Sequence, residues 1–179
     1  MLNPRQTLLA AMIFVAAASR LIPHPPNMTA LTAMALFAGA TLARPRYAFL
    51  VPLAALVLSD LLIGFYSGMV FVYGAFAATV GIGLLLRQRR RPLAIGAASL
   101  AGSALFYLVT NFGVWASSSL YPETGAGLVA CYTAGIPFFR NMVEGDLFYA
   151  AVLFGSFALL ERLVPALKDC VPVKRVPAA

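Results

Sequence analysis

The chain has 179 residues, of which 61% are hydrophobic and only 11% are charged, and its mean hydropathy is +0.88. Soluble globular domains usually carry roughly 45–50% apolar and about 25% charged residues. The composition therefore excludes a soluble enzyme, a disordered tail and a disulfide scaffold. It indicates an all-α integral membrane protein with a single domain over residues 1–179.

Chain length and lysine content narrow the class further. Each crossing of a bilayer needs about 20 apolar residues, so at most about six or seven helices fit. The two lysines, Lys168 and Lys174, both lie near the C-terminus. The chain therefore has no phosphate-binding loop of the Walker type and cannot hydrolyse ATP by that route.

Apolar runs separated by prolines and charges predict a bundle of six membrane-spanning helices. In chain order they cover residues 7–21, 28–42, 47–65, 69–86, 93–115 and 147–164. A long outer loop is predicted between the last two, over residues 116–146. Its many apolar and aromatic residues predict that it packs back onto the bundle, either as a lid or as a re-entrant helix.

The distribution of positive charge orients the predicted bundle. Eleven of the 13 lysines and arginines lie at the termini or after the second and fourth helices, and only Arg20 and Arg140 lie on the other side. By the positive-inside rule both termini are cytoplasmic. The net charge of +7 then reports topology, and no nucleic-acid partner is expected. In an alternative interpretation the first helix is a cleaved signal peptide, with Ala16–Ala18 as the small-residue cleavage site.

Polar residues that this orientation does not explain gather on the outer side. Eleven of them are candidate substrate-binding residues: Arg20, His24, Asn27, Asp60, Tyr73, Asn111, Trp115, Tyr132, Arg140, Asn141 and Asp146. Asp60 carries the strongest signal, because a carboxylate inside a span usually faces the interior and finds a partner. We expect that partner to be Arg20, Arg140 or His24. A purely structural ion pair is the alternative, and the two roles are compatible.

Metal and catalytic chemistry have little support in the sequence. His24 is the single histidine, so no histidine pair can hold zinc. Cys131 and Cys170 lie on opposite sides of the membrane in the predicted topology and cannot form a disulfide. No residue is assigned a catalytic role, and a membrane-embedded enzyme would have to use Cys131 and His24.

Several segments resemble a known family. They are Ser-Arg-Leu-Ile-Pro-His-Pro-Pro-Asn-Met-Thr at 19–29, Leu-Ser-Asp-Leu-Leu-Ile-Gly at 58–64, Thr-Asn-Phe-Gly-Val-Trp at 110–115, Ala-Cys-Tyr at 130–132, Ile-Pro-Phe-Phe-Arg-Asn at 136–141 and Gly-Asp-Leu-Phe-Tyr at 145–149. Together they resemble small bacterial membrane proteins that are described as transport proteins related to the S-components of energy-coupling factor (ECF) transporters.

The resemblance implies a six-helix protein of the bacterial inner membrane that captures an external vitamin or cofactor under its outer loops. Its distant similarity to solitary cobalamin transporters makes a corrinoid a candidate ligand, with His24 or Cys131 as the axial ligand. The first helix lacks the Ala-x-x-x-Ala spacing of S-components that dock on an ECF-type energising module. This favours solitary action, with self-association or a different module as alternatives. A membrane scaffold or assembly subunit without a small-molecule substrate is the competing hypothesis.

Overall fold

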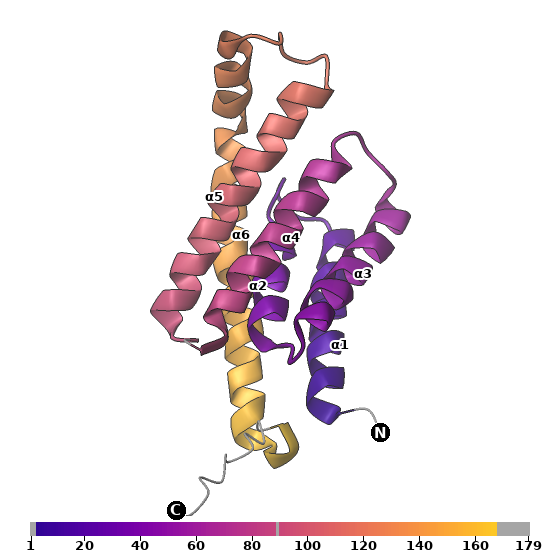
Figure 1. The fold of residues 1–179 in the computed structure, drawn as a ribbon, viewed down its shortest axis with the longest axis vertical. Coiled ribbons are helices and arrows are strands. Elements are labelled where there is room, and N and C mark those ends of the chain that lie inside the picture. The colour runs from indigo at the N-terminus through magenta and orange to yellow at the C-terminus, as the bar shows by residue number, and fades with distance from the viewer. Residues whose placement is uncertain (1–2, 89, 168–179) are drawn as a thin grey trace, which may run out of the picture.

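The computed structural model describes residues 3–88 and 90–167. Within them the chain forms α-helices and short 3₁₀ turns and no strand. The elements are α1 (Pro4–Ala18), η1 (Ser19–Leu21), α2 (Leu31–Thr41), α3 (Pro45–Ile63), α4 (Met69–Leu85), η2 (Leu86–Gln88), α5 (Pro92–Ser117), α6 (Gly125–Leu163) and η3 (Pro165–Leu167). Successive α-helices run up and down the bundle, so α1 begins and α6 ends at the same end (Figure 1).

Several helices start where the local sequence favours a start. Pro4, Pro45 and Pro92 occupy the first turns of α1, α3 and α5, where the missing proline N–H would have no partner in any case. Thr124 caps α6 by accepting a hydrogen bond from the Gly127 N–H at 3.1 Å. The predicted starts at residues 7, 47 and 93 were therefore one to three residues late.

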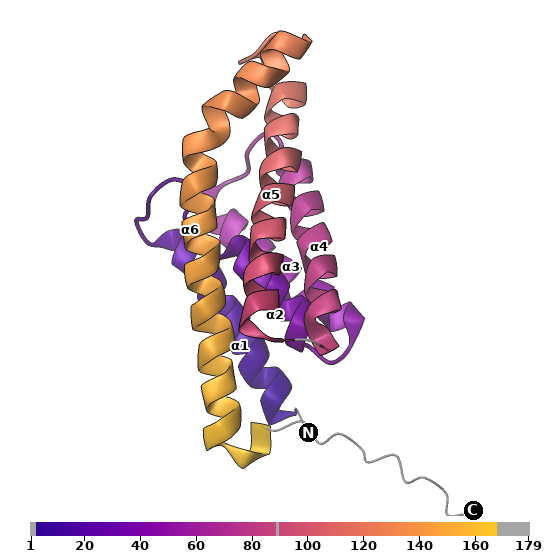
Figure 2. The same ribbon diagram turned by 90° about the vertical axis from the view of Figure 1, so that its left-hand side faces the viewer.

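The prediction of a long outer loop over residues 116–146 is wrong. Helix α6 covers 39 residues, Gly125–Leu163, and only residues 118–124 connect it to α5. The apolar residues that suggested a packed loop instead follow α5 as a second helix. Pro137 lies inside α6, where a proline removes one hydrogen bond and bends a helix without ending it. Figure 2 shows α6 curving along its length.

Helix lengths set the shape of the molecule. At 1.5 Å per residue α6 is about 58 Å long and α5 about 39 Å, against about 30 Å for the hydrocarbon core of a bilayer. The hairpin that α5 and α6 form consequently rises beyond the connection between α3 and α4 (Figure 1). Among the described residues, α3, α4 with η2, α5 and α6 are long and apolar enough to cross a membrane. With 15 and 11 residues, α1 and α2 are shorter than one crossing requires.

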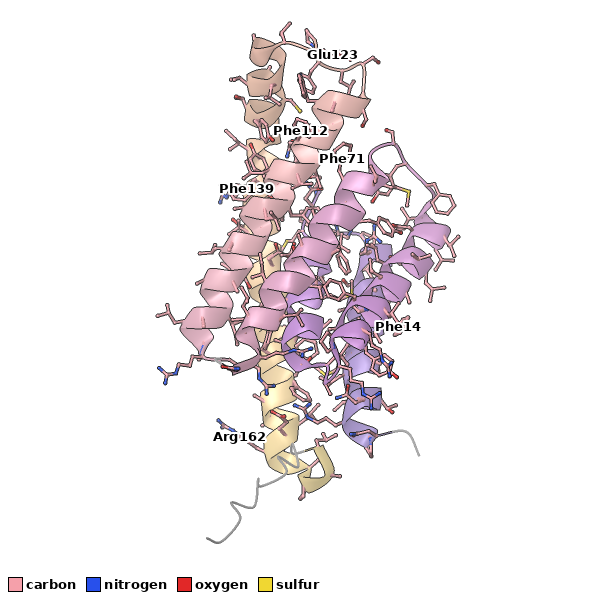
Figure 3. All side chains as sticks on the ribbon, in the orientation of Figure 1. Phe14, Phe71, Phe112, Glu123, Phe139 and Arg162 are labelled. Atoms are coloured by element: carbon pink, nitrogen blue, oxygen red, sulfur yellow. The ribbon has the colours of Figure 1, made fainter. Side chains whose placement is uncertain are left out.

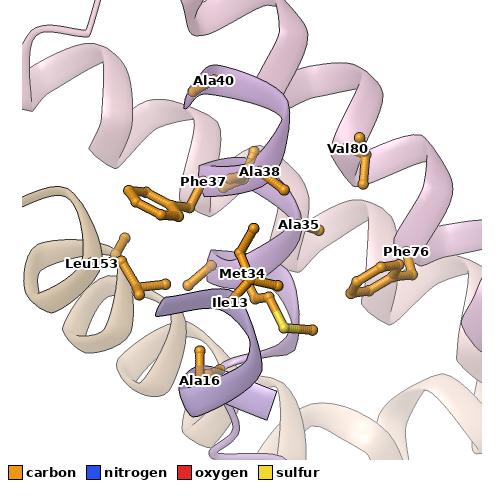
Figure 4. Close-up of a cluster of buried hydrophobic side chains, with 14 of the residues drawn as sticks. Ile13, Ala16, Met34, Ala35, Phe37, Ala38, Ala40, Phe76, Val80 and Leu153 are labelled. Atoms are coloured by element: carbon orange, nitrogen blue, oxygen red, sulfur yellow. The ribbon is translucent and has the colours of Figure 1, made fainter. Parts of the chain in front are cut away.

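Helix α2 lies at the centre of the bundle. It contacts every other α-helix, and all of its residues except Leu31 are buried. Phe37 packs edge-on against Phe154 and Phe157 of α6, with ring centroids 5.2 Å and 5.8 Å apart. Figure 4 shows side chains from α1, α4 and α6 around α2. The backbone polar groups at the ends of a helix enclosed in this way need partners from the rest of the protein.

Charged side chains from other helices satisfy those groups. At the C-terminal end of α2, Arg87 donates to the carbonyl oxygens of Gly39 at 2.9 Å and Leu42 at 2.7 Å, and Arg5 donates to that of Thr41 at 3.3 Å. At the N-terminal end, the carboxylate of Asp146 interacts with the side chain of Thr32 and the backbone N–H of Ala33. The two arginines at the C-terminus of α2 match the negative end of the helix dipole.

The described arginines divide between the two ends of the bundle. Those at the end where α1 begins are Arg5, Arg44, Arg46, Arg87, Arg90, Arg91 and Arg162. Arg20 follows α1 at its far end, and Arg140 lies in the half of α6 that is nearer to α5's C-terminus. Arg89, Lys168, Lys174, Arg175 and Cys170, which also entered the topology prediction, lie outside the described residues.

Candidate functional site

A cavity of about 340 Å³ lies at the N-terminal end of α2. Five parts of the chain form it: the segment 20–32, the connection between α3 and α4, α4, α5 and α6. The lining residues are Arg20, His24, Asn27, Thr29, Leu31, Thr32, Tyr66, Val72, Phe106, Thr110, Val114, Met142 and Asp146. The cavity thus joins four of the predicted site residues, Arg20, His24, Asn27 and Asp146.

Asp60 forms a buried ion pair beside this cavity. Its Oδ1 atom lies 2.7 Å from Nη1 of Arg20, and the side chain of Asp60 is fully buried. The Tyr73 hydroxyl donates to Oδ2 of Asp60 at 2.9 Å, and Arg20 also donates to the hydroxyl of Ser59. Of the three expected partners, the structure therefore selects Arg20. The pair connects the end of α1 to α3, and Tyr73 extends the network to α4.

Tyr66 stands next to this network, in the connection between α3 and α4. Burial raises the pKa of its hydroxyl, and the nearby carboxylate of Asp60 raises it further. Tyr66 therefore stays protonated at neutral pH and offers the cavity a neutral hydroxyl group.

Asp146 provides the second carboxylate of the site. The residue is 1% exposed, and its Oδ2 atom accepts a hydrogen bond of 2.6 Å from the hydroxyl of Ser103 on α5. None of the ion pairs among the described residues involves Asp146. Hydrogen bonds from Ser103 and from the start of α2 stabilise its carboxyl group, and they replace the cation that usually pairs with a buried carboxylate.

The segment before α2 forms the exposed side of the cavity. Asn27 adopts φ of 62°, a left-handed conformation that asparagine tolerates better than most residues. Nδ2 of Asn141 donates to the carbonyl oxygen of Pro26 at 3.0 Å, and Nδ1 of His24 lies 2.9 Å from the carbonyl oxygen of Pro25. Asn141 thus positions the segment and does not itself line the cavity.

The remaining predicted site residues lie in the α5–α6 hairpin, outside this cavity. Trp115 donates to the carbonyl oxygen of Pro122, and Tyr132 donates to that of Leu108. Asn111 accepts, through its backbone oxygen, a 3.4 Å contact from the buried thiol of Cys131. These contacts join α5 to α6 and to the connection between them. Phe112, Glu123 and Phe139 mark the hairpin in Figure 3.

Arg140 also lies outside the cavity lining. Its side chain is 80% exposed and pairs with Glu144 one turn along the same helix, with 3.0 Å between Nε and Oε1. The structure therefore does not bring Arg140 to the cavity with the other predicted substrate-binding residues.

Six polar or polarisable residues that line the cavity or bond to Asp146 were not among the predicted site residues: Thr29, Thr32, Tyr66, Ser103, Thr110 and Met142. Hydroxyl residues in apolar helices usually bond to their own backbone, as Ser103 and Thr110 also do, so their spacing carries little signal. In the described part of the chain, no group of three or more His, Cys, Asp or Glu side chains could hold a metal ion.

Comparison with known proteins places the chain in a family without assigning an activity. No curated protein and no solved structure matches it. One family model matches residues 1–167, which is most of the chain. The chain therefore belongs to the Family of unknown function (DUF6580).

Proposed function

We propose that this protein is a substrate-binding membrane transport protein, similar to a solitary S-component, that captures a small molecule from outside the cell. The observation that carries the proposal is that polar side chains converge on one cavity from three kinds of position: the loop before α2, the start of α2, and the interiors of α5 and α6. Such a pocket, partly apolar with a few placed polar groups, is the common form of a small-molecule site.

The proposed topology places this cavity at the outer side of the bacterial inner membrane. Both termini are then cytoplasmic, since seven described arginines lie at the opposite end of the bundle. The chain crosses six times in this proposal, and α3, α4, α5 and α6 are each long enough for one crossing. Because α1 and α2 alone are too short, the first two crossings also include η1 after α1 and the segment 22–30 before α2, which lines the cavity.

Cavity volume and charge suggest the kind of ligand. A water occupies about 30 Å³ in the liquid, so a cavity of about 340 Å³ holds on the order of a dozen non-hydrogen atoms. The Arg20–Asp60 pair cancels its own charge, whereas Asp146 has no cationic partner among the described residues. We therefore propose a neutral or cationic ligand with hydroxyl or amino groups, of the size of a vitamin fragment. A corrinoid is much larger than this cavity. Cobalamin in the ligand panel therefore tests whether the size of the cavity limits which ligands bind.

Thermal stability in detergent with a panel of vitamins, cofactor precursors, divalent metals and cobalamin would test this. We expect at least one small neutral or cationic compound to raise Tm and to be taken up by cells that express the protein. Asn27→Gly should weaken that binding about tenfold or more, because glycine keeps the left-handed conformation but removes the amide. Glu144→Gln, on the outer surface of α6, is the control and should bind normally.

Two results would count against the proposal. The first is an unchanged Tm with every compound together with no uptake. The second is equal affinity in Asn27→Gly and the original protein for any compound that does bind.

A membrane scaffold or assembly subunit is the second candidate, and one observation favours it. Asp60 is paired with Arg20, and Asp146 is held by Ser103 and α2, so both buried carboxylates already have partners inside the protein. A scaffold predicts that cavity variants change the capture of partner proteins and leave small-molecule binding absent throughout. Affinity purification of the original protein and Asn27→Gly, compared with the ligand panel, separates the two functions.

A further inference from the structure

A second cavity, of about 520 Å³, lies between α5 and α6 in the half of the bundle that holds the arginines. It shares no lining residue with the candidate substrate site. Its walls are mostly apolar, with Ile95 on α5 and Leu147, Ala151 and Phe154 on α6. Along α6 the lining extends from Leu147 to Glu161, about 21 Å at 1.5 Å per residue. That exceeds the depth of one leaflet, about 15 Å of hydrocarbon.

Two glycines leave this cavity open. A side chain at Gly96 or Gly155 would meet no atom within 4 Å. By contrast, a Cβ at Gly102, on the same helix as Gly96, would lie 2.7 Å from Thr32. Gly96 and Gly155 therefore keep space free, whereas Gly102 allows helices to touch. The fully buried Ser99 also lines the cavity, and its hydroxyl has no hydrogen-bond partner in the described chain.

Two consecutive arginines lie at one end of the cavity. Arg90 is part of the lining, and Arg91 follows it directly at the start of α5. The carboxylate of Glu161 pairs with Arg5 at 2.9 Å. An apolar groove between helices with a basic rim on the cytoplasmic side suits an anionic lipid, because the phosphate meets arginine while the chain fills the groove.

We infer that this groove binds an anionic glycerophospholipid, with an acyl chain between α5 and α6 and its phosphate at Arg90 and Arg91. The lipid would complete the packing of the two long helices where their own side chains leave a gap. This inference does not depend on the proposed substrate, because the two cavities are separate.

Lipid binding can be measured on the purified full chain by native mass spectrometry and by Tm. We expect phosphatidylglycerol to be retained and to raise Tm, and phosphatidylcholine to do neither. The double variant Arg90→Gln/Arg91→Gln should lose most of the preference for phosphatidylglycerol. Arg46→Gln removes an exposed arginine from the same end of the bundle and should keep that preference.

Filling the groove provides the second arm of the experiment. Gly155→Leu should fold, since its side chain enters open space, and should retain at least tenfold less phosphatidylglycerol. Gly74→Leu, which also enters open space but on α4, should retain the lipid normally. Equal binding of both lipids, or full retention by Gly155→Leu, would overturn the inference. A dimer that Gly155→Leu dissociates would also overturn it, because a second copy of the chain would then occupy the groove.

Discussion

Asp60 illustrates how a single residue acquires its partner only through the fold. Forty residues separate it from Arg20 in the chain, yet the two side chains form an ion pair with Asp60 fully buried. A carboxylate in this environment is stable only with compensating charge and hydrogen bonds. Arg20, Ser59 and Tyr73 form that network, so the geometry of the cavity wall depends on Asp60.

Asp60→Asn should therefore destabilise the protein strongly. Removing one member of a buried pair leaves Arg20 uncompensated, which typically costs about 3–5 kcal/mol. Thermal unfolding in detergent should show a large fall in Tm. Glu144→Gln, which removes the exposed Arg140–Glu144 pair, should change stability by less than about 1 kcal/mol. Equal Tm values for the two variants would contradict the interpretation of Asp60.

At the scale of elements, α2 is a short helix that depends on its neighbours for packing and for its ends. A Cβ on Gly39 would overlap the carbonyl oxygen of Val80, and one on Gly83 would lie 3.0 Å from the Cα of Gly39. The backbones of α2 and α4 are therefore in direct contact, as small residues permit in membrane helices. The side chain of Arg87 then reaches the carbonyl oxygens of Gly39 and Leu42 at the end of α2.

Gly39→Leu should prevent this contact and reduce the yield of folded protein. The neighbouring atoms belong to the backbone, so they cannot move aside as a flexible side chain would. Gly81→Leu is the matched control, since its side chain would enter open space on α4. Size-exclusion profiles and Tm compare the two. Normal folding of Gly39→Leu would show that α2 and α4 are farther apart than described.

Arg87→Ala should also destabilise the bundle, because it leaves two or more buried carbonyl groups of α2 without donors. Each unsatisfied group costs about 1–3 kcal/mol. Arg46→Ala removes an exposed arginine that stacks on the ring of Tyr47 and lies 3.5 Å from its hydroxyl, and it should have little effect. A similar Tm for both variants would indicate that Arg87 contributes charge to the surface and nothing to α2.

At the scale of the molecule, one end of the bundle carries seven described arginines, and the cavity lies towards the other. Figure 3 shows Glu123 and Arg162 at opposite ends. The proposed orientation turns this asymmetry into a membrane topology, with the connection between α5 and α6 on the outside.

Labelling of single cysteines in intact cells tests the orientation. In a background with Cys131 and Cys170 replaced, His24→Cys and Arg140→Cys should react with an impermeant reagent, because both positions would face outward. Arg90→Cys should react only after the membrane is opened. Reaction at position 90 in intact cells, with positions 24 and 140 protected, would reverse the proposed topology.

Composition and hydropathy were enough to determine that this is a helical chain with helices suited to a membrane, because a bilayer requires long apolar segments whatever their packing. They also located the start of each described helix before α6 to within three residues, and a proline marks three of those starts, in α1, α3 and α5. The sequence singled out Asp60 as well, because an ionisable residue inside an apolar run is costly wherever the run lies.

Only the tertiary structure decided which of those residues meet. Residues 125–146 are helical because they pack along α5. A local sequence interrupted by Pro137 does not show that such a packing partner exists. Arg20 rather than Arg140 pairs with Asp60, and Thr32 and Ser103 join Asp146, because contacts between helices depend on the rotation and depth of each helix. A helix that is apolar on every side, as α2 is, has almost no hydrophobic periodicity. The sequence therefore carries little information about the rotation and depth of such a helix.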